Sequence, residues 1–272
     1  KVLILPDVAA MSDKHVRLVE EWVIGGGRLL SSFQTSLFDE NGVARKDFGL
    51  NKIFGISYLS QIVNTRMDCY QKIVTRNELV KGMEQTSLLH NGGRTLMTKA
   101  LKGTEIITGY LPKINNQPPE NAYPESWESS NPVMVRNRSG KGESIYFANE
   151  IEILNYSFGH PDYDMLLTNS INYLLGNHKI LMTNAPSSVH IYLNKSETSS
   201  DTYQLSLVNT SGSSQRPYRD LIPVNNITIE LPFAIKAANA LSSSSGKEAR
   251  INDNNITIDN LEEFYSLKLI SK

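Results

Sequence analysis

The chain opens with Lys1-Val2-Leu3-Ile4-Leu5-Pro6-Asp7, and a second apolar run follows at Arg28-Leu29-Leu30-Ser31-Ser32-Phe33. Continuous apolar runs of this kind are typical of strands buried on both faces of a parallel sheet. Between them, Ser12 is a candidate N-cap and Gly25-Gly26-Gly27 a candidate helix end, because glycine suits the position that follows a helix. Strand, helix and strand in this order predict a right-handed βαβ unit and an α/β fold. Since a buried parallel strand normally has neighbours on both sides, we also expect elements of this domain before Lys1.

The rest of the first half mixes helical and extended patterns. They predict a short helix near residues 48–54, a helix over 79–89, a long irregular loop over 115–132 and a final helix over Tyr163–Leu175. Strands are expected at Thr95–Ala100 and Glu105–Leu111, and a hairpin is expected from Pro132–Asn137 and Glu143–Ala148 around a glycine-rich turn. Together these elements predict an α/β domain over residues 1–176.

The period of the apolar residues changes near Asn177. Val189, Ile191 and Leu193 alternate with polar residues, and the same alternation recurs in later segments up to the C-terminus. Short alternating strands separated by turns rich in Ser, Asn and Gly are typical of an antiparallel β-sandwich. We therefore expect a second, small β-sandwich domain over residues 177–272.

Composition and charge exclude several classes of function. The 272 residues include 27 Lys and Arg against 28 Asp and Glu, for a formal net charge of −1. This balance provides no basic field for nucleic acid or for an anionic membrane surface, and no apolar run is long enough to span a bilayer. The single cysteine excludes an internal disulfide and a zinc site with several thiolates.

None of the conspicuous motifs predicts a catalytic or cofactor site. The glycine run 25–27 lies between a helix and a strand, whereas phosphate loops lie between a strand and the following helix. Cys69 has no glycine elbow or nearby histidine, so we interpret it as a buried structural residue. The histidines are scattered singly, and His160 stands before a helix that Asp162 could cap. We therefore expect no cofactor, no metal and no catalytic residue.

Two further groups of residues allow a binding role. Asp39 and Glu40 follow the second strand on the side where α/β sheets bind ligands, and they could hold a cation or pair with Arg45. Trp127 and Tyr123 lie on the long loop, where they could serve as stacking platforms for a sugar or anchor the loop to the core.

Short motifs in the first domain resemble a known family. Thr35-Ser36-Leu37-Phe38-Asp39-Glu40, Phe48-Gly49-Leu50 and Gly159-His160-Pro161-Asp162-Tyr163 are similar to the trimerisation domain of bacterial β-galactosidase-type glycoside hydrolases. The resemblance implies a flavodoxin-like fold of the class I glutamine-amidotransferase type. A true amidotransferase would carry a nucleophilic cysteine in a glycine-flanked elbow, and the comparable strand ends Ser32-Phe33-Gln34-Thr35. Amidotransferase chemistry is therefore not expected.

A motif in the second domain resembles the same family. Arg216-Pro217 with Leu221-Ile222-Pro223-Val224 resembles the opening of the small β-sandwich that follows the trimerisation domain in uncharacterised and α-L-fucosidase-like relatives. The resemblance implies a catalytic TIM barrel before this chain, as part of the same polypeptide. Eight βα units with the paired carboxylates of a glycosidase do not fit beside the elements described above.

Our leading hypothesis is a non-catalytic, two-domain region of a glycoside hydrolase that associates with itself, as a cyclic trimer in the parent protein, and with the catalytic barrel of the same chain. The expected interface lies in segments 34–47 and 155–163, and its candidate residues are Phe38, Asp39, Glu40, Arg45, Phe48, Phe158, His160, Asp162 and Tyr163. Two alternatives remain open: a stand-alone hydrolase of the ThuA or amidotransferase type using Asp39, Glu40 or His160, and a carbohydrate-binding module. These aromatic residues could also fold back onto their own domain.

Overall fold

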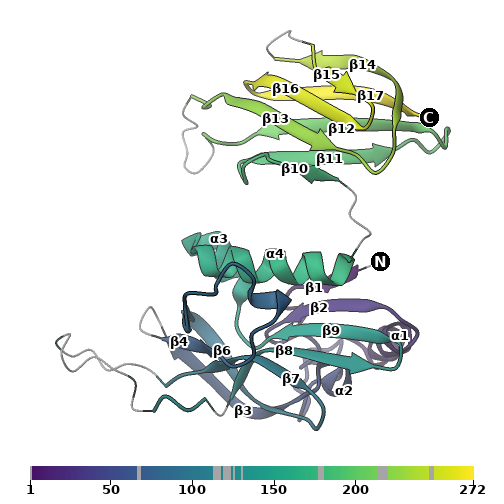
Figure 1. Cartoon of the computed structure of the whole chain (residues 1–272). Coiled ribbons are helices and arrows are strands. Elements are labelled where there is room, and N and C mark those ends of the chain that lie inside the picture. Colours follow the sequence, from purple (N-terminus) through teal and green to yellow (C-terminus); the bar gives the residue numbers. More distant parts are fainter. Residues whose placement is uncertain are drawn as a thin grey trace. The chain divides into compact units, whose positions relative to one another are not determined.

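The computed structural model describes residues 2–65, 69–112, 118, 124, 126–129, 131–176, 181–212, 220–244 and 248–272. The chain divides into two compact units, unit 1 from Lys1 to His178 and unit 2 from Lys179 to Lys272. Figure 1 labels the helices and strands of both. Unit 1 is of mixed α/β type and unit 2 consists of antiparallel sheets, which confirms the expected class of each half.

Unit 1 is built on a seven-stranded sheet with the strand order β1-β2-β9-β8-β7-β4-β5. The first three strands of this order, β1 (Val2–Leu5), β2 (Arg28–Ser32) and β9 (Gly142–Phe147), are parallel to one another. The others pair antiparallel; they are β8 (Pro132–Ser139), β7 (Glu105–Tyr110), β4 (Tyr70–Ile73) and β5 (Leu88–His90). The expected parallel sheet is therefore a mixed one. The reason is the tight turn at 140–141, which joins β8 to β9 as a hairpin and so reverses the strand direction.

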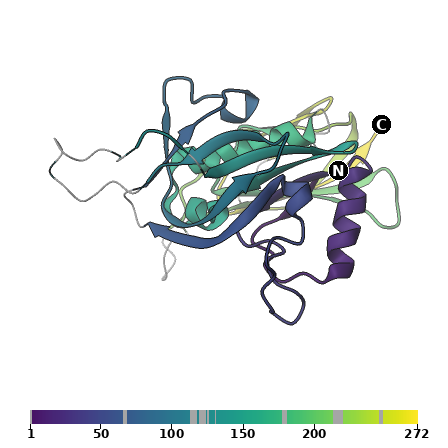
Figure 2. The ribbon, with the colours of Figure 1, turned by 90° about the horizontal axis from the view of Figure 1, so that it is seen from below.

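Helices cover both faces of this sheet. On one face lie α1 (Asp13–Ile24), α2 (Asn51–Phe54) and the separate antiparallel pair β3 (Ile56–Thr65) and β6 (Gly93–Ala100). On the other lie α3 (Ile151–Phe158), α4 (Pro161–Leu175) and the 3-10 turn η1 (Glu78–Val80), as Figure 1 shows. Each face has its own apolar core, which explains why large core residues follow one another directly in the parallel strands, as Leu29 and Leu30 do in β2. Figure 2 shows α1, in purple, beside the loop that follows β2.

Local sequence signals account for most of these elements. The Ser12 side chain accepts a hydrogen bond from the His15 N–H and so begins α1, as expected for an N-cap. The expected hairpin and the final helix are confirmed as β8–β9 and α4. The helix expected over 79–89 is wrong. Asn77 caps only the single turn η1, Gly82 follows with a φ of 86°, and the chain becomes extended again as β5.

Two glycine motifs that are distant in sequence meet at the corner between α1 and β2. The Lys141 N–H donates to the Ile24 carbonyl at 2.9 Å, and the Glu143 N–H donates to the Gly27 carbonyl at 3.2 Å. A Cβ atom on Gly142 would lie 1.9 Å from the Val23 carbonyl oxygen. The hairpin therefore packs directly on the backbone that ends α1, which requires glycine at position 142.

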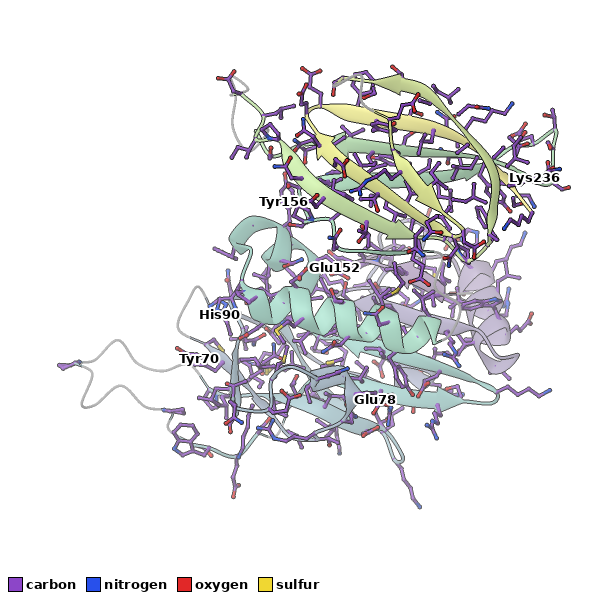
Figure 3. All side chains as sticks on the ribbon, turned by 45° about the horizontal axis from the view of Figure 1, so that its top comes forward. Tyr70, Glu78, His90, Glu152, Tyr156 and Lys236 are labelled. Carbon is purple, nitrogen blue, oxygen red and sulfur yellow. The ribbon has the colours of Figure 1, made fainter. Side chains whose placement is uncertain are left out.

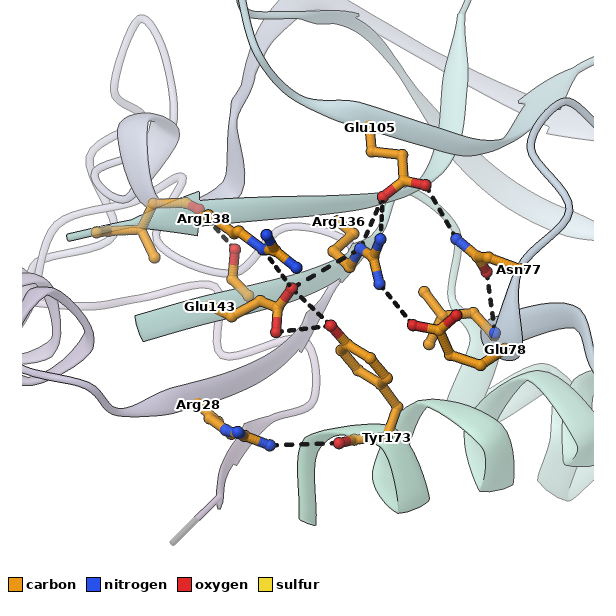
Figure 4. Close-up of polar contacts among 11 residues, drawn as sticks. Arg28, Asn77, Glu78, Glu105, Arg136, Arg138, Glu143 and Tyr173 are labelled. Carbon is orange, nitrogen blue, oxygen red and sulfur yellow. Dashed lines mark hydrogen bonds and ion pairs between the residues drawn. The ribbon is translucent and has the colours of Figure 1, made fainter. Parts of the chain in front are cut away.

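An ionic network ties the sheet to its helical cover (Figure 4). Arg136 on β8 donates to Glu105 at 2.7 Å and to Glu78 at 2.8 Å, and its guanidinium lies 5.2 Å from the centre of the Tyr173 ring on α4. The Tyr173 hydroxyl in turn donates to Glu143, with both carboxylate oxygens at 2.9 Å. This set connects η1, three strands and α4 through one partly buried cation.

Unit 2 contains two four-stranded antiparallel sheets, with orders β10-β13-β16-β15 and β11-β12-β17-β14. The strands are β10 (Met182–Thr183), β11 (Val189–Lys195), β12 (Thr202–Asn209), β13 (Val224–Glu230), β14 (Ile235–Ser243), β15 (Arg250–Asn252), β16 (Asn255–Leu261) and β17 (Phe264–Ser271). Inward residues of both sheets, among them Leu205, Ile229 and Leu267, form one apolar core. The alternating pattern seen in the sequence is the alternation between this core and the outer faces.

Candidate functional site

The three parallel strands end at the same edge of the sheet of unit 1, and the segments that follow them form the candidate site. Asp7 lies just beyond β1, Phe33 just beyond β2, and Glu150 just beyond β9. Ligands of α/β sheets bind outside the carboxyl ends of the strands. The backbone is strained at this edge, since Asp7 and Phe33 have φ angles of 45° and 44°. Left-handed backbone in non-glycine residues costs about 1–2 kcal/mol each and is concentrated at functional sites.

The residue in the strained position after β2 is Phe33, whose side chain is a phenyl ring without polar atoms. Phe33 is fully buried, and its carbonyl accepts a hydrogen bond from the Tyr146 hydroxyl. The Arg94 guanidinium lies over the Phe33 ring, 4.9 Å from its centre. The resemblance to amidotransferases implies a nucleophile at the end of this strand, and a phenyl ring offers none.

At the same edge of the sheet, a hollow of about 350 Å³ lies between the segment that follows β1 and the first part of α3. Its lining residues are Pro6, Asp7, Glu150, Glu152, Ile153 and Tyr156. The Asp7 carboxylate accepts a hydrogen bond from the Gln34 N–H at 3.1 Å, and the Ser32 hydroxyl accepts one from the Asp7 N–H, also at 3.1 Å. Glu150 forms an ion pair with Arg94, whose Nε lies 3.0 Å from the carboxylate. Figure 3 labels Glu152 and Tyr156, which both belong to α3.

Two carboxyl groups of the hollow are electrostatically perturbed. Burial raises the pKa of Glu152 above its ordinary value of 4.5, while a hydrogen bond with Ser32 opposes that shift. Burial also raises the pKa of Asp7 above 3.8, the Gln34 N–H opposes this, and the nearby Glu150 charge adds to it. Carboxyl groups with raised pKa values in a concave site can accept a hydrogen bond and, when protonated, also donate one.

The raised pKa of Glu152 leads to a pH-dependent prediction. The folded state binds this proton more tightly than the unfolded state does, so stability falls as the pH rises from about 4.5 through the pKa of the folded state. We expect Glu152→Gln to be more stable than the wild type at pH 7, and this difference to vanish below about pH 4.5. Urea unfolding at both pH values measures it, with the exposed Glu21→Gln as control. A pH-independent difference would contradict the assignment.

The loop after β2, which was predicted to lie at an interface, is held largely by hydrogen bonds between its own residues. The Asp39 carboxylate accepts hydrogen bonds from the N–H groups of Asn41 and Val43, at 2.8 and 2.9 Å. Arg45 donates to the carbonyls of Phe38 and Met11 and pairs with Asp13, not with Asp39 or Glu40. Glu40 is exposed, Phe38 is half-buried, and Phe48 is buried among the aromatic rings of Phe54, Tyr58 and Tyr146. Phe48 is therefore a core residue and is not on the surface expected for an interface.

The second segment predicted to lie at an interface, residues 155–163, also contains both buried and exposed residues. Phe158 at the end of α3 is 51% exposed, whereas Tyr163 is completely buried. Burial raises the pKa of Tyr163 to about 12, and its hydroxyl lies 2.6 Å from Nδ1 of His90. His160, not Asp162, is the N-cap of α4. Its Nδ1 accepts from the Asp162 N–H, and the Asp162 carboxylate accepts from the His90 N–H.

The two predicted segments begin at the same sheet edge but contact different parts of unit 1. The first makes polar contacts with residues between 5 and 13 and with Tyr58, and the second makes them with residues 90–92. Of the two stacking candidates, Trp127 is 53% exposed, while Tyr123 lies outside the described residues. Cys69 is buried, as expected for a structural cysteine. Arg216-Pro217 also lies outside the described part.

The residues of the hollow were not among the sequence candidates. The sequence did contain a pattern that could have identified them. Asp7 and Glu150 each follow a strand of the parallel set, and Asp39 and Glu40 were chosen as candidates because they follow such a strand. Among the described residues, no group of three or more His, Cys, Asp or Glu side chains is placed to hold a metal ion. In the same part of the chain, no helix is both long and apolar enough to cross a membrane.

The fold of this chain is similar to part of the chain in three glycoside hydrolases of known structure. An α-L-fucosidase, isoenzyme 2 from Paenibacillus thiaminolyticus, has a TM-score of 0.71 at 20% identity, covering 100% of this chain and 41% of that chain. The β-galactosidase from Bacillus circulans sp. alkalophilus has a TM-score of 0.64 at 17% identity, with coverages of 99% and 33%. The β-galactosidase from Rahnella sp. R3 has a TM-score of 0.62 at 14% identity, with coverages of 99% and 32%.

This chain therefore spans between about a third and two fifths of the length of these three enzymes. At such identities the likeness concerns the fold alone. No family model matches the sequence, and the comparison with curated proteins found no match.

Proposed function

We propose that this chain is an accessory region of a carbohydrate-active glycoside hydrolase, in which unit 1 mediates self-association and unit 2 is an accessory β-sandwich. The catalytic barrel belongs to another part of the same polypeptide. The observation that carries the proposal is the coverage: the likeness in fold extends over both units at once, in enzymes named for fucoside and galactoside hydrolysis. A shared order of two different domains is more specific than a likeness to either one.

The finer assignment of unit 1 as a flavodoxin-like, amidotransferase-type domain is part of this proposal. Its support is the parallel set β1-β2-β9, with α1 on one face and α4 on the other. The Phe33 ring at the end of β2 supports a role other than amidotransferase catalysis. An assay of this chain on aryl glycosides and simple esters separates the alternatives. We expect no turnover, and hydrolysis of either substrate would favour a stand-alone hydrolase.

Self-association is tested most directly at Phe158, a large apolar side chain that is half exposed at the end of α3. We expect the full-length protein to sediment as a trimer, and Phe158→Asp to weaken the association by about 30-fold, as for an interface hot spot worth about 2 kcal/mol. Phe38→Asp tests the loop after β2 in the same way. Phe264→Asp on the outer face of unit 2 is the control. A monomeric wild type would remove the proposal of self-association.

A further inference from the structure

We propose that the hollow at the carboxyl ends of β1 and β9 binds a neutral sugar residue. The Tyr156 ring would lie against the apolar face of the sugar, and the carboxyl groups of Asp7 and Glu152 would bind its hydroxyls. The choice of a sugar among hydroxyl-bearing ligands rests on the proposed function. The site itself is argued from its shape, its exposed ring and its polar groups.

The apolar side of the hollow is formed by residues that the core of unit 1 does not use. α3 turns Ile151 and Leu154 inward, whereas Ile153 is 57% exposed and Tyr156 is 91% exposed. With Pro6 they line the hollow. An aromatic face carries partial negative charge, and the C–H groups on one face of a pyranose ring carry partial positive charge, so the two pack favourably.

The polar side contains hydrogen-bonding capacity that the protein itself does not satisfy. In the described part of the chain, one residue that lines the hollow has a buried side-chain polar atom without a hydrogen-bond partner, the Oε1 atom of Glu152. An unpaired buried polar atom costs about 1–3 kcal/mol, and a hydroxyl that donates to Glu152 would offset this cost.

The negative charge of the three carboxyl groups that line the hollow is partly offset by Arg94. Arg94 already pairs with Glu150, and its positive charge also acts on Asp7. The remaining carboxyl of Glu152 is partly buried. Carboxyl groups accept hydrogen bonds from hydroxyls without needing a counter-charge. The volume of about 350 Å³ falls in the range of about 300–1,000 Å³ for small-molecule sites.

The test is a titration of the ¹⁵N-labelled chain with methyl β-D-galactopyranoside and methyl α-L-fucopyranoside, followed by NMR. We expect one of them to shift amide resonances of residues 6–7 and 150–156 with a Kd of about 1 mM. Tyr156→Ala should weaken binding at least tenfold and Glu152→Gln severalfold. Tyr192→Ala, which removes a ring that is 51% exposed on unit 2, is the matched control and should change nothing.

Two outcomes would overturn the proposal. One is the absence of these shifts at sugar concentrations tenfold above the expected Kd. The other is binding of n-propylammonium by the same residues in place of the sugars, which would make the hollow a cation site. Sedimentation of the wild-type full-length protein keeps the two proposals apart. A wild-type trimer that binds neither sugar would remove only the sugar site, whereas a wild-type monomer that binds a sugar would remove only self-association.

Discussion

Replacing Arg136 with methionine is expected to lower the free energy of unfolding of unit 1 by about 2–3 kcal/mol, less than the roughly 3–5 kcal/mol for one partner of a fully buried ion pair, because Glu78 and Glu105 are partly exposed. The Arg136 side chain is only 15% exposed, and its loss leaves the carboxylates of Glu105 and Glu143 close together without their cation. The contacts to Glu78 and to the Tyr173 ring are lost as well. Of the polar links between the sheet and α4, those from the Tyr173 hydroxyl to Glu143 and from Arg28 to the Leu174 carbonyl would remain.

The matched control is Arg138→Met. Arg138 also pairs with Glu143, but it is 76% exposed, so its loss is expected to cost less than about 1 kcal/mol. Both tryptophans, Trp22 and Trp127, lie in unit 1, and tryptophan fluorescence during urea unfolding therefore reports on that unit alone. Adding Glu105→Gln and Glu143→Gln to Arg136→Met should recover part of the loss. Equal effects of the two arginine substitutions would contradict the role assigned to burial.

Replacing Gly142 with alanine is expected to destabilise unit 1 by about 3 kcal/mol or more, as overpacking of a rigid contact does. The added Cβ would lie 1.9 Å from the Val23 carbonyl oxygen and 2.4 Å from that of Gly27. Both are backbone atoms, which cannot rotate away as a side chain could. The hairpin would have to separate from the corner between α1 and β2.

Gly103→Ala separates this steric effect from the conformational cost of losing a glycine. Gly103 has a φ of +93°, and a Cβ there would meet nothing within 4 Å. Its replacement should cost about 1–2 kcal/mol, from backbone strain alone. The same fluorescence measurement applies to both variants. If Gly142→Ala were no worse than Gly103→Ala, the close approach of the hairpin to α1 would be wrong.

The two glycine motifs illustrate the limit of local interpretation. The sequence identified Gly25–Gly27 as the end of a helix and Gly140–Gly142 as a hairpin turn, and both are confirmed, since these conformations depend on residues adjacent in the chain. That the two motifs touch depends on the order of strands in the sheet. The hairpin places β9 beside β2, and only this pairing brings residue 142 against residues 23 and 27.

The candidate site shows the same division. The sequence pattern that indicates such a site is a polar residue shortly after an apolar strand. Asp7, Asp39 and Glu150 all show this pattern. Which of them form a hollow depends on strand order, because β1 and β9 both flank β2 although more than a hundred residues separate them. Likewise, Phe48 and Phe158 both lie near helix ends in sequence, and only the packing of unit 1 buries the first and exposes the second.

By itself, the sequence determined the class of each half of this protein, an α/β part followed by an antiparallel β part. Apolar periodicity and capping residues act over a few positions and so survive without tertiary context. The tertiary structure decided that only three strands of the first sheet are parallel, that Arg136 serves three carboxylates, and that Asp7 and Glu152 share a hollow with the Tyr156 ring. These features depend on contacts between residues far apart in the chain, which are set by the pairing of strands and the burial of apolar faces.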